Sequence, residues 1–234
     1  MRQLIMLGVV VLLSGTTASA NQLAAAEETL VLRYAFDEGK GDVVKDKSGK
    51  GNDGQIHGAR FVKLGDGYAL EFDGADDYVS CPITPSLDMK DVITVEVWVR
   101  PADYAENETV IVAEWPVFGL CQGGGTGGGI WYAPKGHGTA SSPPNGLTPN
   151  QWHHVVGTYD NGKMNLFMDG ELVDTTMSKT NTLWPRKEIK ELWIGRISEE
   201  DSHFFKGKIG AVRIYHRALS PFEVGKRHDA TRDL

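Results

Sequence analysis

The sequence lacks several features that would point to particular classes of protein. After the first twenty residues, no apolar run approaches the about 18 residues that a transmembrane helix needs. Charges of one sign form no long runs, and the formal net charge of -7 would repel a phosphate backbone. Helical periodicity of the apolar residues is nearly absent. We therefore expect no membrane span, no nucleic-acid partner and little helix.

Cysteine is also scarce, with only Cys81 and Cys121 in the whole sequence. Each stands at the end of a strand-like run, and an oxidising compartment would allow them to pair. We expect a disulfide between them. Two buried thiols are the alternative, because sequence cannot show whether the alpha carbons come within the roughly 4.4 to 6.8 Å that a disulfide needs.

The first twenty residues have the pattern of a secretory signal peptide. A basic start at Arg2 leads into an apolar run from Leu4 to Leu13, followed by an Ala18-x-Ala20 cleavage site. We expect cleavage after Ala20 and a secreted or periplasmic protein of residues 21–234, folded as a single domain. Its oligomeric state stays open.

Short runs in which apolar residues recur at every second position predict an all-β fold. Such runs, bounded by Gly, Asp, Asn and Pro, are typical of half-buried strands in packed sheets. They span residues 30–36, 68–72, 77–81, 92–101, 108–114, 128–133, 153–160, 163–170, 171–176, 190–196 and 206–217.

Turn and capping residues refine this prediction. "DNGK" at 160–163 and "DG" at 169–170 supply residues that tolerate positive φ, so three consecutive strands should form an antiparallel meander. After the last strand, Ser220, Pro221 and Glu223 have the spacing of a capping box that begins one short helix. We expect this C-terminal helix at an edge or rim of the sandwich.

The segment "EFDGAD", residues 71–76, approaches the carboxylate spacing of retaining β-glucanases. Glu71 and Asp73 share one face of a strand, and retaining hydrolysis needs two carboxyl groups about 5 to 5.5 Å apart. The third position carries Asp76, which is shorter than the expected Glu and stands in a turn-like "DGADD". We therefore expect no catalytic residues, with a glycoside hydrolase or polysaccharide lyase kept as an alternative.

Two other patterns do not support catalysis. The glycines at 123–128 match Gly-x-Gly-x-x-Gly, but a strand-like run ending in Pro follows them instead of a helix. His153 and His154 are neighbours in a strand, so they face opposite sides of the sheet and cannot act as a close pair.

Taken together, segments along most of the chain resemble the LamG-like jelly roll of the concanavalin A-like lectin/glucanase superfamily. They are residues 34–61, 69–81, 93–101, 151–173 and 205–224, together with "LWIGR". The resemblance implies a jelly-roll sandwich of two antiparallel sheets. It also implies that these strand residues are mostly core: Trp98, Val97 or Val99, Trp152, Val155, Leu166, Ile194, Val212 and Ile214.

Relatives of this kind can carry a structural calcium ion near the loop "DKSGKGNDG", residues 46–54. The resemblance assigns Asp46 and Asn52 as its ligands, whereas the alternative is an Asx-type turn in which both side chains satisfy the backbone. One departure weakens the calcium site. The family's late strand carries two acids where this chain has Gly210 and Ala211, and calcium favours accumulated negative charge.

Carbohydrate recognition would use an aromatic face against a pyranose ring and a few orienting polar groups. The candidates lie in the irregular segment from about 115 to 151: Trp115, Trp131, Tyr132 and His137, with Trp184 as an outlying addition. The alternative for these rings is that they cap the sandwich core. We expect a secreted non-catalytic module that binds carbohydrate or a glycan-bearing surface, with a structural or protein-interaction domain at the cell envelope as the second hypothesis.

Overall fold

The computed structural model describes residues 22–104, 106–114, 117–123, 128–133, 137–183, 191–197 and 203–231. The predicted signal peptide and its cleavage site lie outside these residues. Within them, no helix has the length and apolar character needed to cross a membrane.

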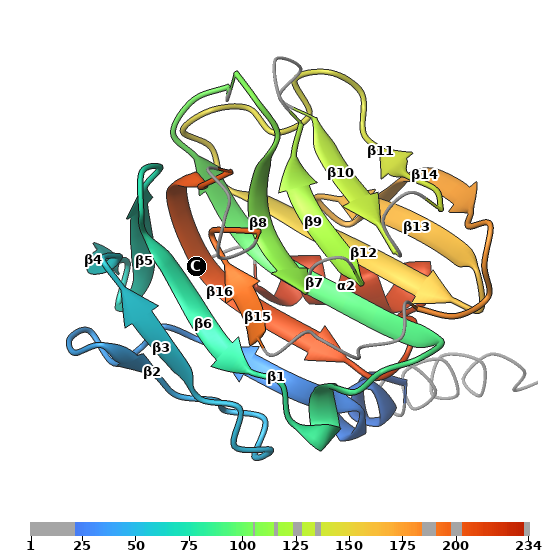
Figure 1. The fold of residues 1–234 in the computed structure, drawn as a ribbon, viewed down its shortest axis with the longest axis horizontal. Helices are drawn as coiled ribbons and strands as arrows, with labels where there is room; N and C mark the ends of the chain where they lie inside the picture. Colours follow the sequence, from blue (N-terminus) through green and yellow to red (C-terminus); the bar gives the residue numbers. More distant parts are fainter. Residues whose placement is uncertain are drawn as a thin grey trace, which may run out of the picture.

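Two antiparallel sheets stacked face to face make up the molecule, which confirms the predicted jelly-roll sandwich (Figure 1). Sheet A has the order β14 (Glu171–Met177), β13 (Lys163–Met168), β12 (His153–Asp160), β7 (Val92–Pro101), β16 (Lys206–Tyr215), β5 (Gly67–Asp73) and β4 (Arg60–Leu64), and β1 (Leu30–Tyr34) also pairs with β16. Sheet B has the order β11 (Ala140–Ser141), β10 (Gly129–Tyr132), β9 (Phe118–Gln122), β8 (Thr109–Glu114), β15 (Glu191–Ile194), β6 (Tyr78–Pro82), β3 (Gly54–His57) and β2 (Val43–Val44). A 3-10 turn, η1 (Pro85–Leu87), follows β6.

The predicted meander is confirmed as β12, β13 and β14. Asn161 and Gly162 have φ values of 47° and 97°, and Asp169 and Gly170 have φ values of 51° and 85°. Positive φ at both central residues is the requirement of the two-residue turn that matches the twist of a hairpin. The residue types at these four positions therefore fix the register of three adjacent strands.

Several strands were not predicted from the sequence: β2, β3, β4, β9 and β11. In β9 all five residues are buried, so the run shows no alternation between apolar and polar positions. β2 and β11 contain two residues each, which is too short for a periodic pattern. The segment from about 115 to 151, expected to be irregular, therefore contains β9, β10 and β11.

The core lies between the two sheets, and it contains most of the residues that were expected there. Valines at alternate positions of β7, Val95, Val97 and Val99, point inward and pack with Val155 and Val212. Trp98 is buried on the opposite face of β7, and Leu166, Ile194 and Ile214 are buried in the interior. Trp152 was expected in the core, but it is only half-buried.

Two helices cover part of the outer face of sheet A, the face turned away from sheet B. Helix α2 (Pro221–Thr231) begins with the predicted capping box, in which the Ser220 and Glu223 backbone N–H groups each donate to the other residue's side chain. Residues 22–28 form a second helix that was not predicted. Ala26 from this helix and Val224 from α2 join a second apolar cluster with Phe167 of sheet A. Helix α2 therefore covers the face of a sheet. The position at an edge or rim that was expected from the sequence is wrong.

A buried carboxylate joins α2 to the middle of sheet A. Glu96 of β7 accepts hydrogen bonds from Arg213 of β16 at 3.0 Å and from Arg227 of α2 at 2.6 Å. Tyr215 donates to the same carboxylate at 3.1 Å, and His154 lies 3.3 Å from it. Burial alone would raise the pKa of Glu96, but the hydrogen bond with His154 and the arginine charges outweigh burial and hold the pKa well below its ordinary value.

The predicted disulfide is wrong, because Cys81 and Cys121 are buried thiols that no disulfide joins. Cys81 lies on β6 and Cys121 on β9, and β15 and β8 separate these strands in sheet B. Three strand spacings amount to about 14 Å, well beyond the reach of a disulfide. Cys81 also faces the interior, whereas Cys121 belongs to a separate apolar cluster with Val110.

We expect Glu96→Gln to lower the free energy of unfolding by about 3 to 5 kcal/mol, because it leaves the buried Arg213 guanidinium without a counter-charge and Arg227 with only the partly exposed Glu27. Urea-induced unfolding at neutral pH measures this loss. The control is Glu171→Gln on the exposed part of β14, which should change stability by no more than about 0.5 kcal/mol. Equal effects of the two substitutions would contradict the role assigned to Glu96.

The stability difference between the wild type and Glu96→Gln should depend on pH. The pKa of Glu96 is lowered in the folded state from its ordinary value of 4.5, so its contribution is fully present above that value and declines as pH falls toward the lower, folded-state pKa. Unfolding measured at intervals from about pH 6 to about pH 3 should therefore show the difference shrinking. A difference that stays constant over this interval would argue against a lowered pKa.

Candidate functional site

The part of the outer face of sheet A that the helices leave open contains a groove of about 630 Å³. It lies over β4, β5, β16 and the end of β7, and we call it the charged groove. Its charged lining residues are Arg60, Glu71, Asp73, Asp77, Arg100, Lys206 and Lys208. The ends of strands therefore supply most of these groups.

Strand register sets the charged residues in a row. Arg60 pairs with Glu71, Glu71 with Lys208, and Lys208 with Arg100, so one row crosses four strands. Directly opposed residues of antiparallel strands lie about 4.5 to 5.5 Å apart and share a face. Residues two positions along the strands, Asp73 and Lys206, form a second row beside the first.

Glu71 is held between two cations of this row. Its carboxylate lies 3.0 Å from the Arg60 guanidinium and 3.4 Å from Lys208 Nζ. Partial burial would raise the pKa of Glu71, but the hydrogen bond from Arg60 and the charge of Lys208 outweigh that effect and lower the pKa. Glu71 therefore stays ionised, which is unfavourable for a general acid of glycoside hydrolysis.

Arg100 differs from the other cations of the groove. Its Nε donates to the backbone oxygen of Asn150 at 2.9 Å. None of the ion pairs among the described residues includes its guanidinium, whereas Lys206 lies 3.0 Å from Asp103. The outer nitrogens of Arg100 are therefore the cationic donors that the groove offers without a carboxylate partner among the described residues.

An aromatic ring lies next to the row of charges. Trp152 is half-buried, and the edge of its six-membered ring passes within 3.3 Å of where a Cβ on Gly210 would stand. Leu64 lies near the same point, at 3.6 Å. The missing side chain at Gly210 thus leaves the space that the Trp152 indole fills. Neither of the acids that the resemblance implies for positions 210 and 211 is present, and the missing side chain at Gly210 makes room for an aromatic surface.

The acidic turn after β5 forms the other end of the groove. Asp73 accepts a hydrogen bond from the Ala75 backbone at 2.7 Å, and Asp77 accepts one from the Asp73 backbone at 2.8 Å. Burial, together with the neighbouring charges of Asp73 and Asp76, raises the pKa of Asp77. Oxygens of Asp73, Asp76 and Asp77 lie within 4.8 Å of one another. Asp76 is exposed in a turn, as expected, and does not complete a catalytic set with Glu71.

The aromatic residues proposed from the sequence as sugar ligands do not meet at this groove. Trp131 is fully buried, packs against Gly157, and donates from its indole N–H to the Thr158 backbone oxygen at 3.1 Å. It therefore belongs to the core, as the alternative had it. Trp115, Trp184 and the side chain of Tyr132 lie outside the described residues.

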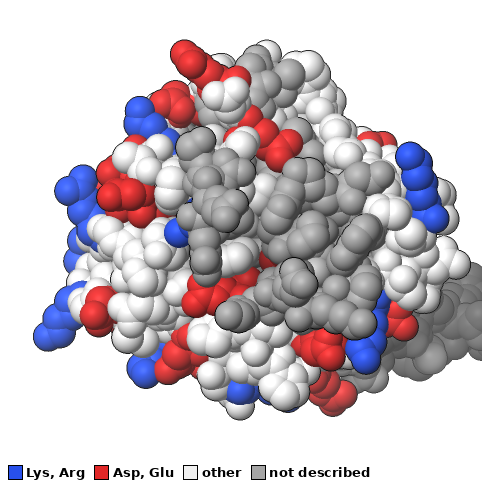
Figure 2. All heavy atoms as spheres, viewed as in Figure 1, with Lys and Arg blue, Asp and Glu red and all other residues white. Residues whose placement is uncertain are grey.

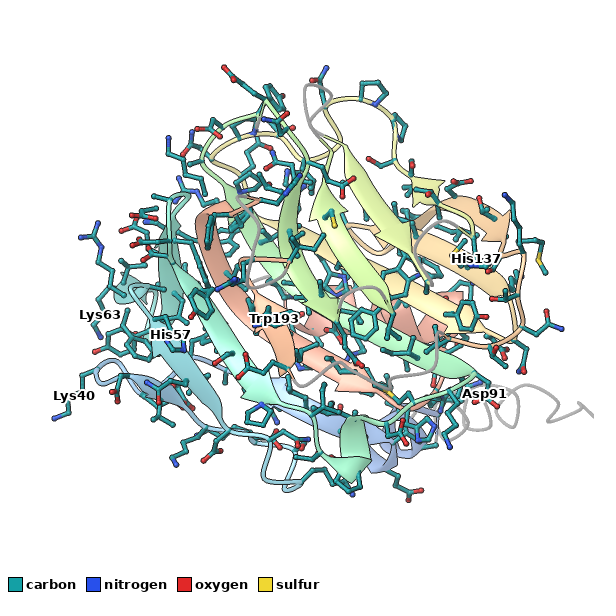
Figure 3. The ribbon with its side chains drawn as sticks, viewed as in Figure 1. Lys40, His57, Lys63, Asp91, His137 and Trp193 are labelled. Carbon is teal, nitrogen blue, oxygen red and sulfur yellow. The ribbon has the colours of Figure 1, made fainter. Side chains whose placement is uncertain are left out.

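His137, the remaining candidate, is half-buried beside the end of β14, where its backbone oxygen accepts from Lys179 at 2.7 Å. Figure 3 shows it on the far side of the molecule from His57, whose neighbour Gly58 lines the charged groove. His137 therefore cannot act together with the groove. Figure 2 shows acidic and basic side chains alternating along the margin where Figure 1 places β3, β4 and β5.

The oxygens proposed as calcium ligands are already engaged by protein donors. The Asp46 carboxylate accepts from the backbone N–H groups of Arg33, Ser48 and Asn52 at 2.9 to 3.0 Å and from the Ser48 hydroxyl at 2.7 Å. The Asn52 amide oxygen accepts from Thr84 at 2.6 Å. These residues do not fit a calcium site, and the geometry is that of the Asx-type turn.

Trp152 and Arg100 were not among the candidate site residues predicted from the sequence, although the sequence contained a signal for both. Val155 and Val99 point inward, so period-two alternation places Trp152 and Arg100 on the outer face. The departure at Gly210 was a second signal, since a strand glycine often marks a close approach of another group.

Comparisons with known proteins agree with this fold. The family model described as the concanavalin A-like lectin/glucanases superfamily matches residues 73–225. No curated protein matches the chain in a sequence search.

Among solved structures, domain 4 of AbnA, a GH43 extracellular arabinanase from Geobacillus stearothermophilus in complex with arabinotriose, has a TM-score of 0.66 and 19% identity, over 85% of this chain and 97% of that one. The binding domain of Paraclostridial Mosquitocidal Protein 1 has a TM-score of 0.70 and 14% identity, over 88% of this chain and 53% of that one. The botulinum neurotoxin serotype D binding domain has a TM-score of 0.70 and 15% identity over the same shares. The chain thus spans about half the length of these toxin domains.

We expect Asp46→Ala to lower the free energy of unfolding by about 1 to 3 kcal/mol, because it leaves donors of its turn without an acceptor. The loss should be the same with added calcium as with a chelator, since the carboxylate serves protein donors. Thermal and urea unfolding under both conditions measure it, with the exposed Asp66→Ala as control. A loss that occurs only in the presence of calcium would restore the calcium assignment.

Proposed function

The chain belongs to the concanavalin A-like lectin/glucanases superfamily, and from this we propose that it is a non-catalytic carbohydrate-binding module whose binding surface is the charged groove together with Trp152. The observation that carries the proposal is the half-buried Trp152 ring lying across Gly210, next to a row of hydrogen-bonding side chains. The predicted signal peptide supports a secreted or periplasmic location, where such a module would meet extracellular glycans.

The combination of groups in the groove suits a sugar. A pyranose or furanose ring has an apolar side that packs on an indole, and hydroxyl groups that both donate and accept hydrogen bonds. Arg60, Arg100 and Lys208 supply donors, and Asp73 and Asp77 supply acceptors, all within one groove. A ring seated on Trp152 would therefore find hydrogen-bonding partners for hydroxyls on its edges.

Known structures of this fold support a binding role. The arabinanase domain contains an oligosaccharide, and this chain covers 97% of that domain's length. The toxin domains are described as binding domains. At 19% identity and below, these likenesses establish the fold, and the choice of carbohydrate as ligand rests on the groove itself.

The absence of catalysis is part of the proposal. Glycoside hydrolysis by two carboxyl groups requires one of them to be a protonated acid, which a raised pKa provides. Glu71 has a lowered pKa because Arg60 and Lys208 stabilise its charge. Asp73 serves as an acceptor for the turn that follows it. Asp77 has a raised pKa, but its carboxylate accepts a hydrogen bond from the Asp73 backbone. All three carboxylates of the groove are therefore engaged in structural interactions.

Protein recognition is a second candidate function, favoured by the edge strand β14. Leu172 and Met177 on this strand are 47% and 64% exposed, and an edge strand can add a strand from a partner. Capture of a partner that Leu172→Lys abolishes and Trp152→Ala leaves unchanged would favour this function over carbohydrate binding.

We expect Trp152→Ala to weaken glycan binding about tenfold or more, because the sugar loses its aromatic contact. The mature protein would be screened on a glycan array, and the affinity for the best ligand would then be measured by calorimetry. Phe222→Ala removes an exposed ring from α2 and should leave affinity unchanged. Unchanged binding by folded Trp152→Ala would exclude this surface as the sugar site.

A further inference from the structure

We infer that the glycan bound in the charged groove carries an anionic group, a carboxylate or a sulfate, held by Arg100 with help from Lys208. This inference rests on the proposed function and narrows it to acidic sugars. It is argued from the balance of charge along the row, from the hydrogen bonding of Arg100 and from its place beside Trp152.

The row that crosses the groove has an excess of positive charge. Arg60, Lys208 and Arg100 face the single carboxylate of Glu71. Glu71 forms ion pairs with Arg60 and Lys208, so one negative charge is shared between two cations. Arg100 stands beyond Lys208 in the row and forms none of the ion pairs among the described residues. The surplus charge is therefore concentrated where Lys208 and Arg100 meet.

The fixed orientation of Arg100 suits an anion. Its Nε is already used on the Asn150 backbone oxygen at 2.9 Å, which fixes the plane of the guanidinium. The remaining nitrogens form a planar fork that matches the two oxygens of a carboxylate or sulfate. Arg100 is only partly exposed. Solvent therefore screens the attraction between its guanidinium and an anionic ligand less than it would on an open surface.

The backbone of Trp152 lies on the side of Arg100 away from Lys208, and its ring extends back across β7 to Gly210 on the strand of Lys208. Val99 pairs with His153, so the next residues, Arg100 and Trp152, face each other at the end of the ladder. The two chain segments stay close beyond this pair, because the Asn150 backbone N–H donates to the Pro101 oxygen at 2.7 Å. A sugar ring on the indole would thus direct a pendant acidic group to Arg100 without moving the backbone.

The acidic end of the groove sets the orientation in which such a ligand would bind. Asp73 lies in the second row opposite Lys206, whose charge is paired with Asp103, and Asp77 lies beside Asp73. These carboxylates repel an anion and accept hydrogen bonds from hydroxyl groups. An acidic sugar would therefore lie with its charged group at Arg100 and its hydroxyls toward the aspartates. A neutral sugar would leave the Arg100 fork without an anionic partner.

The test uses the mature chain and an array of oligosaccharides in matched sets: galactan and galacturonan, glucan and glucuronan, and a galactan with and without sulfate. We expect the wild type to bind at least one acidic form about tenfold or more tighter than its neutral counterpart. The carboxylated and sulfated members distinguish the two sources of charge. Added salt should weaken this preference, because part of it is electrostatic.

The decisive variants are Arg100→Gln and Lys208→Gln, with Lys163→Gln on the exposed part of β13 as the charge-matched control. Arg100→Gln should reduce binding of the acidic form about tenfold or more and leave the neutral form within about twofold. Lys208→Gln should reduce the acidic form by a smaller factor, and Lys163→Gln should change neither. Circular dichroism and thermal unfolding would show that each variant is folded.

Two outcomes would overturn the inference in different ways. Equal binding of neutral and acidic forms, unaffected by Arg100→Gln but weakened by Trp152→Ala, would reject the anionic ligand and leave the proposed function intact. Absence of binding to every member of the array would reject both the inference and carbohydrate recognition.

Discussion

The outer face of sheet A depends on one buried carboxylate. Glu96 is buried away from solvent. Its charge is therefore stable only while Arg213, Arg227 and Tyr215 surround it. Arg227 comes from α2, and the same guanidinium lies 2.7 Å from Glu27 of the N-terminal helix. Both helices are therefore tied to the middle of the sheet by groups that cannot separate without leaving a buried charge. That constraint decides which half of the face is covered.

The uncovered half is the half that can bind a ligand. The strands β7 and β16 extend beyond the helices, and their exposed ends bring Arg100 and Lys208 together in one row. Apolar cover would have buried these cations at a high cost, whereas open to solvent they remain charged and accessible. The distribution of polar residues along a single pair of strands thus separates a structural region from a binding region.

Features set by neighbouring residues could be predicted from the sequence. The Asn161–Gly162 turn and the capping box of Ser220 and Glu223 depend on the conformational preferences of a few adjacent residues. That successive side chains of β7 point to opposite faces of the sheet follows from strand geometry alone. Features set by strand order could not be predicted. Cys81 and Cys121 are far apart because β15 lies between their strands in sheet B. β15 comes more than a hundred residues after Cys81 in the sequence.

The two tryptophans show the same limit at the candidate site. Trp131 has apolar neighbours on both sides, Ile130 and Tyr132, so alternation could not decide which face it takes. Trp152 could be assigned to the outer face by alternation, but the resemblance to a known fold favoured a core position. Its partner Gly210 lies on a strand that the sequence does not connect to it, and only the paired sheet brings the two together.

A binding surface built on paired strands has an evolutionary consequence. Most charged side chains of the charged groove stand on strands of sheet A whose positions are fixed by backbone hydrogen bonds to neighbouring strands. Exchanging one residue can therefore alter which ligand is preferred while the remaining side chains keep their spacing. Binding surfaces of this kind diversify by single substitutions on an unchanged framework of strands, whereas binding sites built from loops also change by insertion and deletion.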